Sequence, residues 1–293
     1  MTDLENNPPY ILVADDHSLE ARAAAGTAFQ IAQNQNLAIR GLYIIDEVLA
    51  LDTYANYYAE LPDLSIASND TGREPASRAE LMIWLETQGE IALDWLVTAG
   101  AEAGVPVTTK LLAGGVVELI LRETAQAKLL AIGRRGHGHK NDSKSFGHNF
   151  RKIAHHVHLP MLVGGRTTPS LQRLLLAYHG QAHANEALAW AAQLQRDLAA
   201  EVIVLSVCDN AESCRSEMSL EEIETSLAQS CLDNYRLLIG RGRPSTEIAT
   251  VAIKNDVDLI ILGRYRHSAP VEWFLGSTVD RLLRATSLPV LIA

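Results

Sequence analysis

The sequence YILVADDHS (residues 10–18) joins a run of five apolar residues to a polar turn, and a helical pattern follows it through Ala28 and Ile31. About 160 residues later, LLLAYHGQ (residues 174–181) repeats this order of apolar run, polar turn and helical pattern. Two further pairs of segments match, namely KLLAIGR (128–134) with DLIILGR (258–264), and HLPMLV (158–163) with SLPVLI (287–292). The sequence therefore predicts one domain that occurs twice, with a short closing strand at the end of each copy.

Apolar runs alternate with amphipathic stretches within each copy, which indicates a parallel sheet covered by helices on both faces. We therefore predict an α/β fold: two tandem copies of a five-stranded parallel sheet flanked by helices, Rossmann-like, in residues 1–165 and 166–293. The expected strands lie near 10–15, 38–45, 106–112, 128–133 and 160–164, and near 172–178, 201–207, 235–240, 258–263 and 288–292. The expected helices of the first copy lie near 18–34, 79–103, 115–125 and 146–156.

The junction between the copies is the turn-rich run 164–170, which is short, so the copies should pack together. We expect a pseudo-twofold relation between them, because the closing runs 161–163 and 290–292 are apolar enough to pair as strands at a shared interface. Each copy is expected to keep its own sheet rather than to join one continuous sheet. The chain would then be an internal pseudo-dimer, and a homodimer is the other arrangement left open.

Composition limits the class of protein. Hydrophobic residues make up 47% of the chain and charged residues 20%, which is typical of a folded globular protein. A net charge of −10 disfavours nonspecific binding to nucleic acid or to an anionic membrane. Residues 1–9 contain no apolar signal-peptide core, and no run of about 18 apolar residues occurs. Cys208, Cys214 and Cys231 show no Cys-x-x-Cys spacing, so we expect reduced thiols and a cytoplasmic location.

The loop after the fourth strand of the first copy is the main candidate for ligand binding. In parallel sheets, ligands bind beyond the carboxyl ends of the strands, where the strand order reverses. Residues 133–140 form a glycine-rich loop, and a helix is expected to begin within 145–149. Between Arg134 and Lys152 there are six basic residues against one acid, which favours an anion such as a phosphate chain. A solvated connection without a ligand is the alternative.

The second copy contains a related arrangement. Gly263 follows its fourth strand, and Gly276, Ser277 and Thr278 open a helix. The two hydroxyl groups suit either the cap of that helix or hydrogen bonds to an anion.

These loops and the repeat resemble the universal stress protein family, whose motif after strand four is Gly-x2-Gly-x9-Gly-[Ser/Thr]. The resemblance covers nearly the whole chain, twice over, and implies the tandem-domain type. Its ATP-binding members hold adenine near an Asp after strand one and an aliphatic residue after strand two, with the phosphates on the glycine motif. By position, it implies a nucleotide site at Asp16, Ile44, Gly133, Arg135, Gly136, Gly147 and His148, and a weaker one at Val207, Gly263, Gly276, Ser277 and Thr278.

Both copies depart from that motif. In the first, ten residues separate Gly136 from Gly147, and His148 replaces the Ser or Thr. In the second, the nine-residue spacing is kept, but Arg266 replaces the second glycine and His179 replaces the Asp. A glycine-rich loop can absorb one extra residue, whereas a histidine cannot replace a carboxylate acceptor. We therefore expect the first copy to be the more capable nucleotide site.

Other chemistries have less support. Histidines cluster near the first loop, but a Zn²⁺ site requires three or four converging ligands, and on a helix only His155 and His158 would share a face. We therefore expect no metal site. The sequence contains no Gly-x-Ser-x-Gly, His-Glu-x-x-His or complete Gly-x4-Gly-Lys-[Ser/Thr] motif, so we assign no catalytic residues, and slow ATP hydrolysis stays as an alternative. The polar stretch 46–78, with its three tyrosines, is a lid over the first site, a partner-docking segment or a plain surface loop.

The resemblance thus implies a tandem universal-stress-type protein that binds ATP or a related nucleotide and acts in the stress response through an unknown protein partner, and we expect it to be cytoplasmic. The main alternative is an interaction or dimerisation scaffold in which both nucleotide sites are degenerate. The combination of Asp16 with Gly133 and Gly136 favours the first interpretation.

Overall fold

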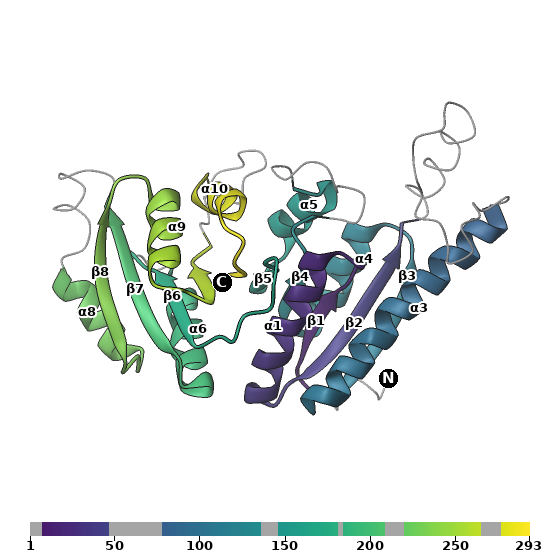
Figure 1. Cartoon of the computed structure of the whole chain (residues 1–293), viewed down its shortest axis with the longest axis horizontal. Coiled ribbons are helices and arrows are strands. Elements are labelled where there is room, and N and C mark those ends of the chain that lie inside the picture. Colours follow the sequence, from purple (N-terminus) through teal and green to yellow (C-terminus); the bar gives the residue numbers. More distant parts are fainter. Residues whose placement is uncertain (1–7, 47–77, 136–145, 181–183, 209–219, 265–276) are drawn as a thin grey trace.

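The computed structural model describes residues 8–46, 78–135, 146–180, 184–208, 220–264 and 277–293 (Figure 1). The first copy contains β1 (Tyr10–Ala14), α1 (Leu19–Gln35), β2 (Ala38–Ile45), α3 (Arg78–Ala103), β3 (Val107–Ala113), α4 (Val116–Glu123), β4 (Ala127–Ile132), α5 (His148–His156) and β5 (Met161–Val163). The second contains β6 (Arg173–Ala177), α6 (Asn185–Leu198), β7 (Glu201–Cys208), α8 (Leu220–Gln229), β8 (Tyr235–Arg241), α9 (Pro244–Lys254), β9 (Leu259–Leu262), α10 (Ser277–Ala285) and β10 (Val290–Ile292). The predicted α/β class and strand positions are confirmed to within about two residues. The stretch proposed as a lid or docking segment falls on residues 47–77, outside the described residues.

The ten strands of the described residues form one sheet, in the order β3-β2-β1-β4-β5-β10-β9-β6-β7-β8. The two halves of this order contain equivalent strands in reverse sequence, as a pseudo-twofold axis between β5 and β10 requires. β5 and β10 run antiparallel, with Leu162 facing Leu291 at their centre. The other neighbouring strands pair in parallel.

The predicted pairing of the closing runs is therefore confirmed, but the expectation of two separate sheets is wrong. Within its own copy each closing strand would be an edge strand, and the backbone N–H and C=O groups on its outer side would lack partners. Pairing of these two edges through backbone hydrogen bonds necessarily joins the two sheets into one.

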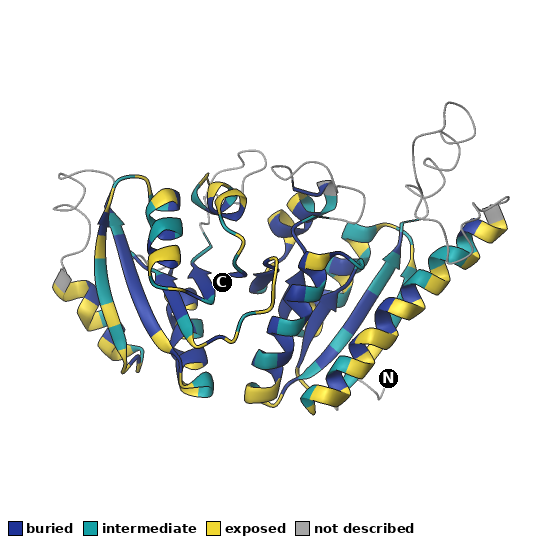
Figure 2. Cartoon of the chain, viewed as in Figure 1, coloured by how far each residue is buried: buried dark blue, intermediate teal, exposed yellow. Residues whose placement is uncertain are grey.

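Helices cover both faces of the sheet (Figure 1). Neighbouring residues of β1 belong to different cores. Ile11 and Val13 belong to the core that also contains residues of α1, α3, α6 and α8, whereas Leu12 belongs to the core that contains residues of α4, α5, α9 and α10. Figure 2 shows the central strands buried throughout, and these three residues are fully buried. Burial on both faces explains why the strands are continuous apolar runs in the sequence.

The junction between the copies packs against α1. Gln30 Nε2 donates a hydrogen bond to the carbonyl of Pro169 at 2.7 Å, and a Cβ added to Gly26 would collide with the Thr168 side chain. A Cβ added to Gly165 would lie 2.7 Å from Pro289 N of the second copy. These contacts hold the copies together, as the short linker predicted.

The cysteines differ from the expectation. Cys208, the last residue of β7, is disulfide-bonded, whereas Cys231 is a free, exposed thiol. The expectation of three reduced thiols is therefore wrong, because the lack of a Cys-x-x-Cys spacing does not exclude a bridge between more distant cysteines. In the parts of the chain that the structure describes, no helix is both long and apolar enough to cross a membrane.

Candidate functional site

The carboxyl ends of β1, β2 and β4 meet at one edge of the sheet. β1 and β4 are neighbours, but the chain leaves them in opposite directions, toward β2 and toward β5, so this is the point where the strand order reverses. Ala14, the last residue of β1, pairs with Leu42 on one side and with Ile132 on the other. This register brings Asp16, Ile44 and Gly133 to the same edge of the sheet.

The chain turns tightly from β1 into α1. Asp16 is half-buried, and its Oδ1 accepts a hydrogen bond from Ser18 N–H at 3.0 Å. Ser18 Oγ in turn accepts a hydrogen bond from Ala21 N–H at 3.1 Å and so caps α1. His17 between them has a φ of 67°. Asp16 therefore stabilises this turn, in addition to any role toward a ligand.

The fully buried carboxylate of the turn is Asp15, which is 3% exposed. Its Oδ1 accepts a hydrogen bond from His17 N–H at 2.9 Å, and its Oδ2 lies 3.2 Å from Arg22 Nε. Burial raises the pKa of Asp15, and the positive charge of Arg22 opposes this shift only in part. Arg22 also stacks on Trp95 of α3, with its Cζ 4.0 Å from the ring centroid.

The same polar cluster reaches α3 and β2. His17 Nε2 donates a hydrogen bond to the carbonyl of Gln88 at 3.0 Å, which leaves Nδ1 as the acceptor for Arg22 Nη2 at 3.3 Å. The Tyr43 ring stands edge-on to His17, with 6.4 Å between centroids. Burial, together with the charges of the two aspartates of the turn, raises the pKa of Tyr43 to about 12. We call Asp15, His17, Arg22, Tyr43 and Trp95 the Asp15–Arg22 cluster.

The close packing of the α1 N-terminus leaves no room for a side chain at Gly133. A Cβ at this position would lie 2.9 Å from Ser18 Oγ and 3.0 Å from Ala21 N. The N-terminus of α1 therefore sits directly against the end of β4. The sequence suggested that Gly133 lets the backbone approach a phosphate, whereas the close approach in the structure is to α1.

Arg135 and Gly147 lie near the same edge. Arg135 Nε donates a hydrogen bond to Glu20 Oε1 at 2.9 Å and Nη2 contacts the same oxygen, with both side chains largely buried. Gly147 N–H donates to the carbonyl of Arg134 at 3.3 Å, and α5 begins at the next residue without a side-chain cap. Gly136 and the side chain of His148 lie outside the described residues.

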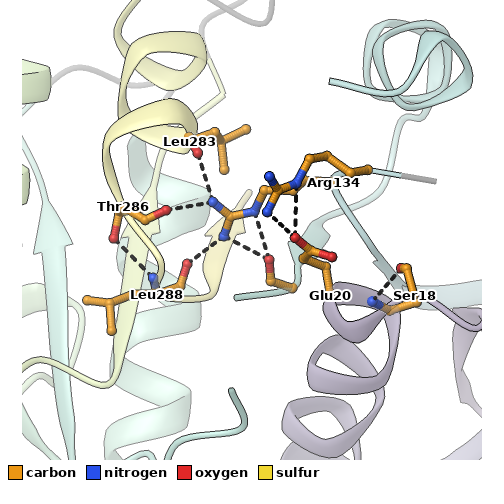
Figure 3. Close-up of polar contacts among 9 residues, drawn as sticks. Ser18, Glu20, Arg134, Leu283, Thr286 and Leu288 are labelled. Atoms are coloured by element: carbon orange, nitrogen blue, oxygen red, sulfur yellow. Dashed lines mark hydrogen bonds and ion pairs between the residues drawn. The ribbon is translucent and has the colours of Figure 1, made fainter. Parts of the chain in front are cut away.

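Arg134 extends away from this edge toward the second copy (Figure 3). It is 5% exposed and donates hydrogen bonds to the carbonyls of Leu283, Thr286 and Leu288 at 2.7, 2.7 and 2.9 Å. Two further hydrogen bonds, of 3.0 and 2.8 Å, reach the carbonyl of Gly164. Burial lowers the pKa of Arg134 to about 10, so the guanidinium stays charged at neutral pH. The count of six basic residues therefore overstated the positive charge that is available to an anion.

The second copy places its candidate residues at the equivalent edge. Tyr178 N–H donates to the carbonyl of Leu205 at 3.0 Å, as Asp15 N–H does to Leu42, so His179 takes the position of Asp16. The Tyr178 hydroxyl bonds to Asn185 Oδ1 at 3.0 Å, in place of the Asp15–Arg22 ion pair. Val207 and Gly263 are half-buried at the ends of β7 and β9, and Ser277 and Thr278 open α10. Gly276 lies outside the described residues.

The histidines near α5 are arranged differently from the prediction. α5 ends at His156, so His158 is not on the helix and cannot share a helical face with His155. The rings of His155 and His156 lie edge to face, with 4.9 Å between centroids. No group of three His, Cys, Asp or Glu side chains suited to a metal ion occurs within the described ranges.

Sequence reasoning missed the Asp15–Arg22 cluster and the contacts of Arg134 with the second copy. A signal for Arg134 was present, because KLLAIGR and DLIILGR keep an arginine at the same position although the loops that follow them differ. No such signal marks Asp15, since Tyr178 stands at its position in the second copy.

Comparison with known proteins extends these observations. The model of the universal stress protein family matches residues 10–163 and again residues 170–293. A universal stress protein of Synechocystis is 26% identical over 165 residues, and this match spans 56% of the present chain and 56% of that protein. The chain therefore covers about half the length of this relative.

Solved structures match over nearly the whole chain. A universal stress protein from Archaeoglobus fulgidus has a TM-score of 0.70 at 17% identity, covering 97% of this chain and 95% of its own. A putative universal stress protein from Pseudomonas aeruginosa has a TM-score of 0.65 at 15% identity, covering 97% and 92%. At such identities the likeness shows a shared fold for both copies together.

Proposed function

This chain belongs to the universal stress protein family, with two copies of the family's domain, and on that premise we propose that its first copy binds an adenine nucleotide such as ATP or AMP. The second copy is a weaker site or a purely structural one. Nucleotide binding then alters contacts with a protein partner in the stress response. The boundary between the two copies is proposed at residues 165 and 166.

One observation carries this proposal: the strand register brings Asp16, Ile44 and Gly133 to the edge where the strand order reverses. At such an edge, Asp16 is the acceptor for an adenine or ribose donor, and Ile44 is the apolar contact for the base. The start of α5 at Gly147 and His148, with Arg135 and Gly136 of the preceding loop, provides donors for phosphate oxygens. The Asp15–Arg22 cluster supports the turn that carries Asp16.

The second copy has fewer groups suited to binding a nucleotide. Its residues Val207, Gly263, Gly276, Ser277 and Thr278 remain the proposed contacts. However, His179 stands where Asp16 stands in the first copy, so the carboxylate acceptor is missing.

Two observations favour the scaffold alternative. Gly133 packs against α1, and Arg135 is paired with Glu20, so two residues of the proposed phosphate loop already have structural partners. If neither site binds a nucleotide, the role left to the fold in this chain is to join the two copies and to present their surfaces to partners. A cytoplasmic location stays in the proposal, although the disulfide at Cys208 removes the cysteine argument for it.

Calorimetric titration of the full chain with ATP tests the proposal. Asp16→Asn keeps the Oδ1 acceptor for Ser18 N–H but removes the charge, and we expect it to weaken ATP binding roughly tenfold, about 1.4 kcal/mol. The matched control is His179→Ala at the equivalent position, which should leave affinity unchanged. Loss of binding in Ser277→Ala but not in Asp16→Asn would assign the site to the second copy. No binding to the wild-type chain at millimolar ATP would favour the scaffold.

A further inference from the structure

An arginine stands at the same position in both copies, and the side chain of each arginine donates hydrogen bonds to the other copy. Arg134 follows Gly133 at the end of β4, and Arg264 follows Gly263 at the end of β9. Arg264 Nη1 donates to the carbonyl of Val157, and its Nη2 donates to that of Leu159 at 3.1 Å.

These contacts repeat those of Arg134. In the alignment of the closing runs, Leu159 corresponds to Leu288 and Val157 to Thr286, and both of the latter carbonyls accept hydrogen bonds from Arg134. The two arginines therefore make the same pair of contacts, related by the pseudo-twofold axis.

The acceptors lie where two helices end. Leu283 belongs to the last turn of α10 and Thr286 follows its end, while Val157 caps the end of α5. Carbonyls at a helix C-terminus lack intrahelical donors and carry the negative end of the helix dipole. A planar guanidinium with several donors suits two such carbonyls at once, and Figure 3 shows Arg134 reaching Leu283, Thr286 and Leu288 in this way.

The two helices that the arginines contact at their C-termini, α5 and α10, begin at the candidate sites. α5 starts after Gly147 in the first copy, and α10 starts at Ser277 in the second. The main chain of Arg134 touches the start of α5, because its carbonyl accepts the hydrogen bond from Gly147 N–H. One residue thus contacts the start of α5 with its backbone and the end of α10 with its side chain.

We propose that Arg134 and Arg264 couple the two copies, each fixing from one copy the position of the helix that borders the candidate anion site of the other. Arg264 is then a positioning residue for the first nucleotide site, although it lies in the copy with the weaker motif. The consequence for ligand binding rests on the proposed function, whereas the positioning of the helices does not.

Hydrogen exchange measured by mass spectrometry on the full chain tests the positioning without a ligand. In Arg264→Met, we expect amides of α5 to exchange roughly tenfold faster and those of α10 to be unchanged. In Arg134→Met, the faster exchange should be in α10. Arg281→Met is the matched control, since it removes an exposed arginine of the second copy and should change neither helix. Where a methionine variant fails to fold, Arg134→Lys and Arg264→Lys replace it, and each should loosen the same helix to a smaller degree.

Faster exchange confined to the arginine's own copy, or none in either helix, would overturn the proposal. With ATP, binding to the wild-type chain should protect α10 as well as α5, and Arg264→Met should bind ATP about fivefold more weakly, whereas Arg281→Met should not. Unchanged protection of α10 together with wild-type affinity of Arg264→Met would refute the coupling and leave the proposed function intact. If the wild-type chain binds no ATP, the proposed function fails, and the ligand-free exchange pattern alone decides the positioning.

Discussion

Leu162 of β5 faces Leu291 of β10 at the centre of the antiparallel pair that joins the two copies. The two leucines occupy the same position in HLPMLV and SLPVLI, so the pseudo-twofold axis passes between a residue and its own repeat. Both side chains are 0% exposed. The junction is therefore part of the hydrophobic core, and the two copies should unfold as one unit.

Leu162→Ala should lower the free energy of unfolding by about 2–5 kcal/mol, because it leaves a cavity in a fully buried layer. Urea unfolding followed by circular dichroism measures this, and a single transition is expected. The control is Leu19→Ala, a leucine that is 79% exposed, which should change stability by less than about 0.5 kcal/mol. Two separate transitions in the wild-type chain would contradict a shared core.

Gly133→Ala should destabilise the protein by about 1–3 kcal/mol without any ligand, because the added Cβ meets Ser18 Oγ at 2.9 Å and Ala21 N at 3.0 Å. Thermal unfolding of the ligand-free chain is the measurement. Gly115→Ala is the control, since a Cβ there has its nearest neighbour, Glu118, at 3.9 Å. Equal stability of the two variants would mean that Gly133 is not a packing requirement.

The fold was predictable because continuous apolar runs alternate with amphipathic helical stretches along the sequence. Ile11 and Leu12 are adjacent and both fully buried, one in each core, so a strand of this sheet has to be apolar at every position. The repeat then located the equivalent strands of the second copy. Joining of the sheets follows from the predicted pairing of the closing runs once β5 and β10 are the edge strands of their own copies, and the expectation of separate sheets overlooked this.

The candidate site was only partly predictable. Register follows from strand order, so the convergence of Asp16, Ile44 and Gly133 could be expected. Arg134 stands inside a basic, glycine-rich run, and nothing local distinguishes it from Arg135, yet its partners in the second copy lie 149 to 154 residues away. Asp15 and Asp16 are neighbours of the same type, and only the packing of α1 and α3 decides which of them is buried.

Asp15→Asn should change how stability depends on pH. Because burial raises the pKa of Asp15 in the folded state, folding takes up a proton between the ordinary pKa and the raised one. Stability of the wild type should therefore fall relative to Asp15→Asn as pH rises through this window. The attraction of Arg22 acts only on the ionised carboxylate and is already part of this net upward shift, since Arg22 stays charged.

Urea unfolding of both chains between about pH 4 and pH 7 measures this difference. Asp94→Asn, an exposed carboxylate of α3, is the control and should show no such trend. If the wild type instead gains stability relative to Asp15→Asn as pH rises, the pKa of Asp15 is lowered in the folded state. That result would contradict the conclusion that burial outweighs the attraction of Arg22.

Glu20→Gln should strengthen the binding of ATP if the proposed function is correct. Arg135 is now paired with Glu20 beside the sheet edge, and both side chains are largely buried, so the carboxylate competes with an incoming anion for the guanidinium. Removing that charge leaves the Arg135 charge uncompensated, and we expect affinity to rise roughly tenfold, with a steeper dependence on salt. Calorimetric titration at two salt concentrations is the measurement, and Glu221→Gln, an exposed acid of α8, is the control for net charge. Weaker binding in Glu20→Gln would mean that the ion pair positions Arg135 for the phosphates instead of withholding it from them.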